Sequence, residues 1–136
     1  MKTLPTLIKL HKQDLDTLLI AKRHLMQQIQ EQEQQLTHHL EQAQIEFRQY
    51  INTNLSHLVH QYTKMAQKRT DQMRAYLANL NAELAVVECN ITQAFVELRK
   101  YETLQENIYM AAQQEEQRAE VKELDALGLL VCTESS

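Results

Sequence analysis

Histidine is the residue type in this chain most suited to binding a metal. His57 and His60 are three residues apart, so a helix would place both imidazoles on one face. A structural metal site in a protein needs about four ligands. No third ligand lies near this pair in the sequence, so we interpret both histidines as solvated side chains and predict no metal site.

The candidates for acid–base or nucleophilic catalysis are equally isolated. Ser56, Ser135 and Ser136 have no base arranged beside them, and Glu115 and Glu116 are neighbours that belong to a solvated acidic face. Catalysis needs a nucleophile, a base and oxyanion donors that converge in a concave pocket. We therefore predict that the chain is not an enzyme, with no catalytic residue and no cofactor.

The two cysteines do not form a disulfide framework. Cys89 and Cys132 lie 43 residues apart in a chain that has no other cysteine. We interpret both as reduced thiols, which is typical of a cytoplasmic protein.

The composition indicates long helices. The 136 residues include one Gly and one Pro, and Pro5 and Gly128 bracket 122 residues that contain neither. Sandwiches and barrels need these residues in their tight turns, and phosphate-binding loops need several glycines. The composition therefore excludes those classes and favours an all-α fold.

The charge is unevenly distributed along the chain. Residues 1–70 hold nine Lys/Arg against six Asp/Glu, whereas residues 71–136 hold five against twelve. A nucleic-acid-binding protein would concentrate basic residues on one face, so we expect no nucleic-acid partner. The sequence shows no targeting segment and no apolar run near the length of about 20 residues that a membrane span requires.

Heptad spacing supplies the main structural signal. Apolar residues at alternating steps of four and three are typical of a coiled coil. We call the row of residues with this spacing the seam. In the second half the seam comprises Met73, Leu77, Leu80, Leu84, Val87, Ile91, Ala94, Leu98, Tyr101, Gln105, Ile108 and Ala112. A weaker seam in the first half comprises Leu4, Ile8, His11, Leu15, Leu18, Lys22, Leu25, Ile29, Gln32 and Leu36.

Two irregularities in the spacing locate the turn. After Leu36 the apolar positions become Leu40, Ala43, Phe47 and Tyr50, which requires a stutter, and Met65, Arg69 and Met73 are also four apart. If the two irregularities face each other in an antiparallel hairpin, the turn centre lies near residue 53. The local sequence 52–56, rich in Asn, Thr and Ser, favours a turn.

We therefore predict an antiparallel two-helix coiled-coil hairpin that forms a single domain over residues 1–136. The first helix would span residues 4–51, the turn 52–54 and the longer second helix 55–127, followed by a flexible tail over 128–136. Leu4 falls opposite residue 102, so residues 103–127 would have no partner within the hairpin. A lone helix of that length is marginal in water, and we expect it to meet a partner.

Several short motifs occur in the order found in a known family. The sequence resembles the FliJ flagellar export proteins, which are related to the stalk proteins of type III secretion ATPases. The resemblance rests on Leu4-x-Thr6-Leu7-x-x-Leu10 with Leu15-Asp16, on Glu46-Phe47-Arg48, on Ala94-Phe95-x-Glu97-Leu98-Arg99-Lys100-Tyr101-Glu102, and on Glu123-Leu124-Asp125.

The resemblance implies a non-catalytic role in flagellar or type III protein export. It implies that the chain enters the pore of the hexameric export ATPase and promotes its assembly, contacts the cytoplasmic domain of the export gate, and escorts export chaperones. The protein would then be cytoplasmic and reach the membrane only through partners. The matching gate positions are Leu40, Phe47 and Tyr62, and those for the ATPase pore are Leu4, Leu7, Ile8, Ile108, Ala112 and Leu124.

Two questions stay open at this level. The numbers of Phe47 and Tyr62 sum to 109, so the two rings could equally face each other as core residues of the hairpin. Ala66, Arg69 and Met73 occupy further contact positions but differ in type from the family pattern. A scaffold or tether that dimerises into a helical bundle is the alternative function.

Overall fold

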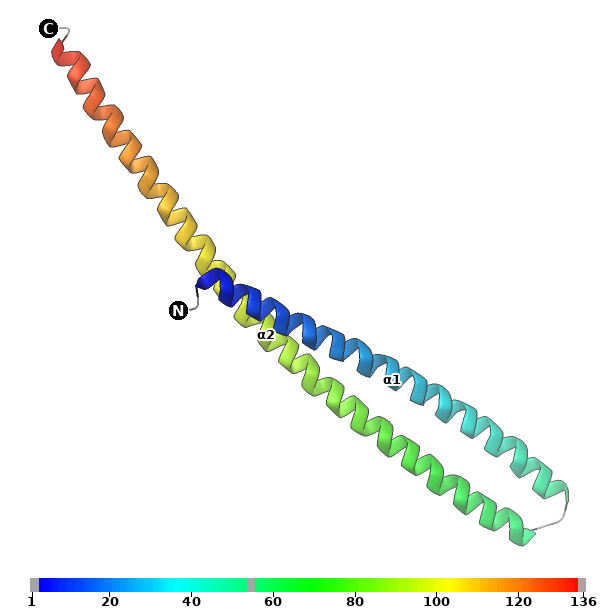
Figure 1. Ribbon diagram of the computed structural model, residues 1–136. Helices are drawn as coiled ribbons and strands as arrows, with labels where there is room; N and C mark the ends of the chain where they lie inside the picture. The colour runs from blue at the N-terminus through cyan, green and yellow to red at the C-terminus, as the bar shows by residue number, and fades with distance from the viewer. Residues whose placement is uncertain (1–2, 54–55, 135–136) are drawn as a thin grey trace. The chain divides into compact units, whose positions relative to one another are not determined.

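The computed structural model describes residues 3–53 and 56–134, and almost all of them are helical. Helix α1 spans Leu4–Asn52 and helix α2 spans Ser56–Glu134, 49 and 79 residues respectively (Figure 1). The all-α class and the longer second helix are therefore confirmed. The prediction that residues 1–136 form a single domain stays a prediction.

The first helix ends where the turn residues change the hydrogen bonding. Thr53 donates both its backbone N–H and its hydroxyl to the carbonyl of Tyr50, at 3.3 and 2.9 Å. Side-chain hydroxyls that bond to the local backbone compete with helix continuation. Of the predicted turn 52–54, Asn52 is instead the last residue of α1 and Thr53 forms a turn, whereas residues 54 and 55 lie outside the described residues.

The predicted end of the second helix is wrong. α2 continues through Gly128 to Glu134, where the sequence analysis placed a flexible tail. Gly128 does not adopt the left-handed conformation that ends many helices. A glycine inside a helix costs only about 1 kcal/mol relative to alanine, and the two leucines that follow Gly128 are good helix formers.

The chain divides into two compact units. One comprises residues 14–93, in which α1 and α2 lie side by side and antiparallel, and the other comprises the described parts of 1–13 and 94–136 (Figure 1). In the first unit Leu25, Ile29, Leu77 and Leu80 form the buried core, extended by Leu36, Leu84 and Val87. In the second unit Ile8 and Leu98 are buried, and the rings of His11 and Tyr101 stack with centroids 4.9 Å apart.

The seam of α1 keeps its heptad spacing to the turn. Beyond Leu36 the residues that face inward are His39, Ala43, Glu46 and Tyr50. The predicted stutter on α1, which placed Leu40 and Phe47 in the seam, is therefore wrong. The prediction assumed that apolar residues face inward, whereas the polar residues His39 and Glu46 occupy the seam and the apolar residues Leu40 and Phe47 lie beside them.

The seam of α2 does contain an irregularity, but with other residues. Tyr62, Ala66 and Thr70 face inward at two successive steps of four, whereas Met65 and Arg69 are exposed. The predicted pairing of two stutters is thus only half correct, although the turn derived from it is in the right place. The inward-facing pattern of α2 ends at Glu102, so Gln105, Ile108 and Ala112 do not belong to the seam.

Candidate partner-binding surfaces

The three residues predicted to bind the export gate line one groove. Leu40 and Phe47 lie two turns apart on one face of α1, and Tyr62 comes from α2. The groove has a volume of about 310 Å³, and its α2 side is completed by Thr63, Ala66, Gln67 and Thr70. Leu40 and Phe47 retain 37% and 38% of their accessible surface, so both can contact a partner without leaving the hairpin.

The local register explains this exposure. His39 and Glu46 occupy the seam, so the residues that follow them lie on its flank and pack only partly. Tyr62 packs against Tyr50, with ring centroids 5.2 Å apart at an angle of 42°. The ring that faces Tyr62 in the hairpin is therefore Tyr50, which leaves Phe47 as a residue of the groove.

The electrostatic environment of the groove keeps Tyr62 neutral. Burial, a hydrogen bond to Glu46, and the charges of Glu46 and Tyr50 raise the pKa of Tyr62 from 10.0 to about 12. All three causes disfavour the phenolate. The groove therefore presents a neutral phenol beside apolar side chains throughout the physiological pH range.

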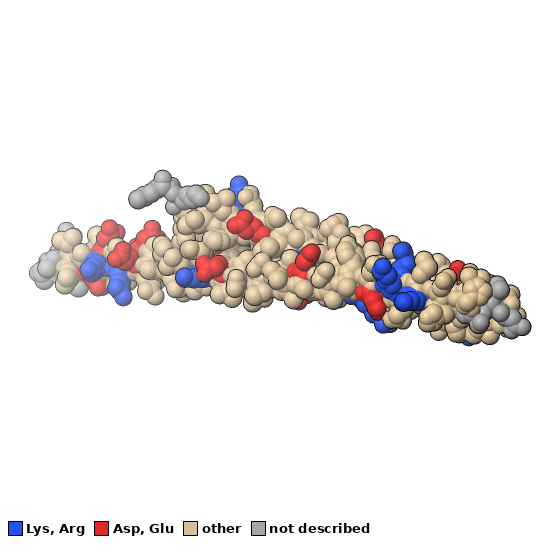
Figure 2. Space-filling view, turned by 90° about the horizontal axis from the view of Figure 1, so that it is seen from below, with Lys and Arg blue, Asp and Glu red and all other residues tan. Residues whose placement is uncertain are grey.

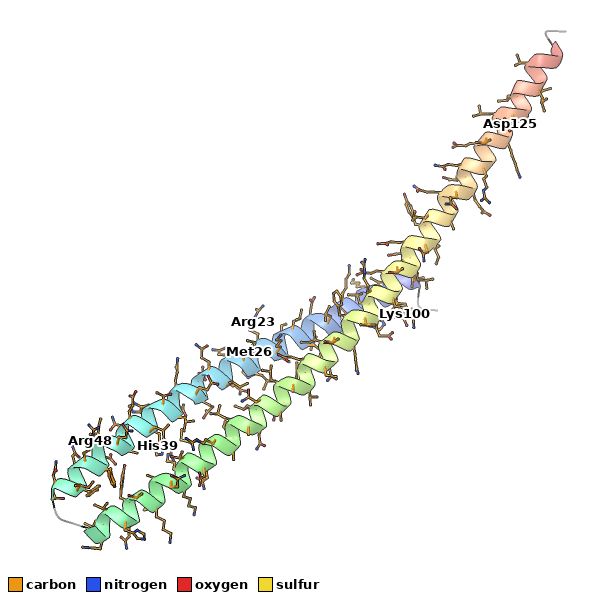
Figure 3. The ribbon with its side chains drawn as sticks, turned by 180° about the vertical axis from the view of Figure 1, so that it is seen from behind. Arg23, Met26, His39, Arg48, Lys100 and Asp125 are labelled. Atoms are coloured by element: carbon orange, nitrogen blue, oxygen red, sulfur yellow. The ribbon has the colours of Figure 1, made fainter. Side chains whose placement is uncertain are left out.

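A polar contact crosses the hairpin beside this groove. His39 Nε2 lies 3.3 Å from the carbonyl oxygen of Ala66 and 3.2 Å from Thr70 Oγ1, and the Thr70 hydroxyl donates to the same carbonyl at 2.9 Å. A carbonyl only accepts, so His39 Nε2 carries the hydrogen. Figure 3 shows His39 between α1 and α2. Thr70 is 5% exposed, and we expect this contact to fix the register of the two helices.

The further contact positions implied by the resemblance are separated. Ala66 lines the groove with Phe47, whereas Arg69 and Met73 line a second groove with His38 and His39. Sequence reasoning also missed Ile51, which is half exposed and follows Phe47 by one helical turn. The four-residue spacing between Phe47 and Ile51 could have indicated from the sequence that the two side chains share a face of the helix.

The N-terminal residues predicted to enter the ATPase pore take part in packing. Ile8 is buried, and Leu4 and Leu7 are half-buried. Ile8 therefore contributes to the fold of its unit, and only the outer surfaces of Leu4 and Leu7 are open to a partner.

The C-terminal part of α2 is exposed over its whole described length. Every residue from 103 to 131 is exposed, among them Ile108 and Leu124. At 3.6 residues per turn, Ile108 and Ala112 share a face, while Leu124 lies about 160° around the helix from Ile108. These three residues predicted for the ATPase pore therefore do not share one face, and the large apolar side chains of this segment lie in two stretches, around 104–112 and 121–131.

This segment is also acidic. Residues 103–131 contain six Asp/Glu and two Lys/Arg. By contrast, charged residues are sparse on much of the surface shown in Figure 2, where most of the visible area is neither acidic nor basic. The segment combines large apolar side chains with negative charge, which suits a partner surface that is apolar and basic.

No candidate metal site emerges from the described residues. His57 and His60 are both exposed, and no group of three or more His, Cys, Asp or Glu within residues 3–53 and 56–134 could hold a metal ion. Cys89 is exposed, and Cys132 belongs to the residues whose side chains are not described. Neither described helix contains a stretch that meets the length and hydropathy of a membrane span.

Comparison with known proteins gives one match. A family model described as "Flagellar FliJ protein" matches residues 1–131. Neither the curated proteins nor the solved structures gave a match. The matched range includes both helices almost entirely, with the groove and the exposed C-terminal segment.

Proposed function

The chain belongs to the family of flagellar FliJ proteins and is therefore a flagellar export-related protein, and from this premise we propose that it couples the hexameric export ATPase to the export gate without catalysing a reaction itself. In this proposal the protein is cytoplasmic and reaches the membrane only through its partners. Its escort of export chaperones is part of the same proposal, with no residue assigned.

The exposed segment 103–131 carries the ATPase part of the proposal. It is a helix whose large apolar side chains are exposed to solvent. Isolated helices gain most of their stability from packing an apolar face. Insertion into a ring of subunits would supply that packing, and Leu4 and Leu7 would add their exposed surfaces.

The groove of Leu40, Phe47 and Tyr62 carries the gate part. It is open, largely apolar and formed by both helices, so it is present only when the hairpin is folded. A partner side chain placed there would bury the exposed surface of two large apolar residues, which is the kind of contact that dominates binding energies.

The first test is the turnover of the cognate hexameric export ATPase with and without the full chain. We expect the protein to raise ATP hydrolysis, and Leu124→Asp to reduce that effect. Val96→Asp is the matched control, because Val96 is also exposed but lies outside segment 103–131. Equal stimulation by both variants would contradict a role for the segment.

The second test is binding to the isolated cytoplasmic domain of the gate. We expect Ile51→Asp to weaken binding, because Ile51 adjoins Phe47 and is exposed enough to leave the hairpin folded. Ile45→Asp is the control, since Ile45 has a similar exposure on another face of α1. If the protein is instead a scaffold, we expect an obligate dimer that does not change ATP turnover and does not bind the gate domain.

A further inference from the structure

Helix α1 has an apolar row beside its seam that the hairpin does not bury. The row occupies the position directly after every second seam residue, at steps of seven. Leu19, Met26, Leu40 and Phe47 belong to it, with Glu33 in the middle. All four apolar members are exposed, Met26 to 51%.

The other flank of the same seam has a different composition. The corresponding positions there are Ala21 followed by Gln28, Gln35, Gln42 and Gln49. In a two-stranded coiled coil both flanks are ordinarily polar. An apolar seam widened on one side is typical of a helix that packs against more than one neighbour in a bundle.

The row borders two open grooves of the unit 14–93. Leu19 and Met26 line the first together with Leu84 of α2. Leu40 and Phe47 line the second. The α2 lining includes a polar residue one position after the seam in each groove, Asn81 in the first and Gln67 in the second.

We propose that a second copy of this chain occupies the row, with the two α1 helices antiparallel about a two-fold axis at Glu33. The spacing is symmetric about that residue. Leu19 would face Phe47 of the second copy, and Met26 would face Leu40 of the second copy. An isologous contact needs one patch that is complementary to itself, and this row satisfies that condition.

The two-fold axis brings together acidic Glu33 and basic Arg74 side chains. Two Glu33 carboxylates would meet there, which is unfavourable unless a cation is close. The Lys22–Glu88 ion pair and the His39–Thr70 hydrogen bond show that facing residues of α1 and α2 have numbers summing to about 110. Arg74 therefore lies opposite residue 36, within one turn of Glu33.

Arg74 is also on the correct flank of α2. It is seven residues from both Gln67 and Asn81, which border the two grooves. Neither Arg74 nor Glu33 belongs to an ion pair within residues 3–53 and 56–134. The dimer would thus place two Arg74 guanidinium groups beside two Glu33 carboxylates.

The interface is small, because the four apolar residues are already partly buried in the hairpin. Stable protein interfaces bury about 800 Å² on each partner, and we expect less here. The association is therefore weak and depends on concentration. The dimer would cover Leu40 and Phe47, so the dimer and the proposed gate complex exclude each other. Self-association is measured without the ATPase and without the gate, so the test of the dimer is independent of the proposed function.

Sedimentation equilibrium of the full chain over a series of concentrations tests the surface. We expect a reversible monomer–dimer equilibrium, in which Met26→Lys raises the dissociation constant about tenfold or more. Gln35→Lys adds the same charge on the opposite flank and should change it little. A strictly monomeric chain, or equal effects of the two variants, would overturn the proposal. Helicity by circular dichroism confirms that both variants fold.

Charge reversal tests the axis. Arg74→Glu should weaken the dimer, and Glu33→Lys combined with Arg74→Glu should restore it, whereas Glu33→Gln should weaken it severalfold because the Arg74 guanidinium groups lose their partners. Cysteine cross-linking tests the register in a chain with Cys89→Ser and Cys132→Ser. Met26→Cys and Leu40→Cys chains should cross-link when mixed and not separately. Cross-linking of Met26→Cys with itself would overturn the antiparallel arrangement.

Discussion

Residues 59–102 and 103–131 of α2 are equally helical but differ in what surrounds them. In the first stretch an inward-facing residue recurs every three or four positions, and Leu80 is only 4% exposed. In the second stretch every residue is exposed, including eight Leu, Ile or Val side chains. One helix thus contains a packed part and a part with an unburied apolar surface.

The difference teaches that helix formation and burial have separate causes in this chain. Good helix formers without Pro are sufficient to continue the backbone hydrogen bonding. Burial requires a second helix at the right distance, and α1 supplies it only as far as its own first residue, Leu4. The second stretch is therefore helical without the burial of apolar side chains that stabilises the first.

We expect the largest difference between the packed and the exposed stretch of α2 when one leucine in each is replaced by alanine. We expect Leu80→Ala to lower the free energy of unfolding by about 2–4 kcal/mol, because it opens a cavity in the core of Leu25, Ile29 and Leu77. Leu124→Ala should change it by less than about 0.5 kcal/mol. Urea unfolding followed by circular dichroism measures both. Similar losses for the two variants would mean that the C-terminal segment packs within the isolated chain.

The polar contact in the packed part offers a second test. Thr70→Val keeps the shape but removes the hydroxyl that bonds His39 and Ala66. We expect a loss of about 1 kcal/mol in urea unfolding. His39→Leu combined with Thr70→Val should recover that loss, since an apolar pair leaves no buried polar group without a partner. If the double variant is less stable than Thr70→Val, the His39–Thr70 contact itself contributes to the free energy of unfolding and does not serve only to fix the register.

Gly128→Ala tests the unburied part alone. Nothing lies within 4 Å of the position a Cβ would take at residue 128. We expect slower amide hydrogen exchange around residue 128, by at most about fivefold, because alanine favours the helix by up to about 1 kcal/mol. The urea midpoint of the hairpin should stay the same. A shifted midpoint would contradict the separation of the two parts.

The smallest effect concerns pH at the turn end of the packed part. The pKa of Tyr62 is raised from 10.0 to about 12, so its contribution to stability is complete below pH 10 and is lost as the pH rises through 12. We expect the wild type to lose more stability than Tyr62→Phe between these values. Alkaline unfolding curves of both proteins measure the difference, and parallel curves would exclude a contribution from Tyr62.

The heptad pattern carried most of the information that could be predicted. The steps from Met73 to Tyr101 are uniformly apolar, and the structure places all of these seam residues inward. The groove residues Leu40 and Phe47 were identified, but they were assigned to the seam because they are apolar. Pattern analysis could not recognise His39 and Thr70 as inward-facing, since their burial depends on each other across the hairpin.

By itself the sequence determined the helical class, the site of the turn, the unequal helix lengths and the extent of pairing. These properties follow from local propensity, from the scarcity of Gly and Pro, and from counting residues on either side of the turn. Only the tertiary structure decided which of two adjacent residues, His39 or Leu40, faces inward. That choice requires a hydrogen-bond partner on the other helix, and a partner 31 positions away cannot be recognised from either residue alone.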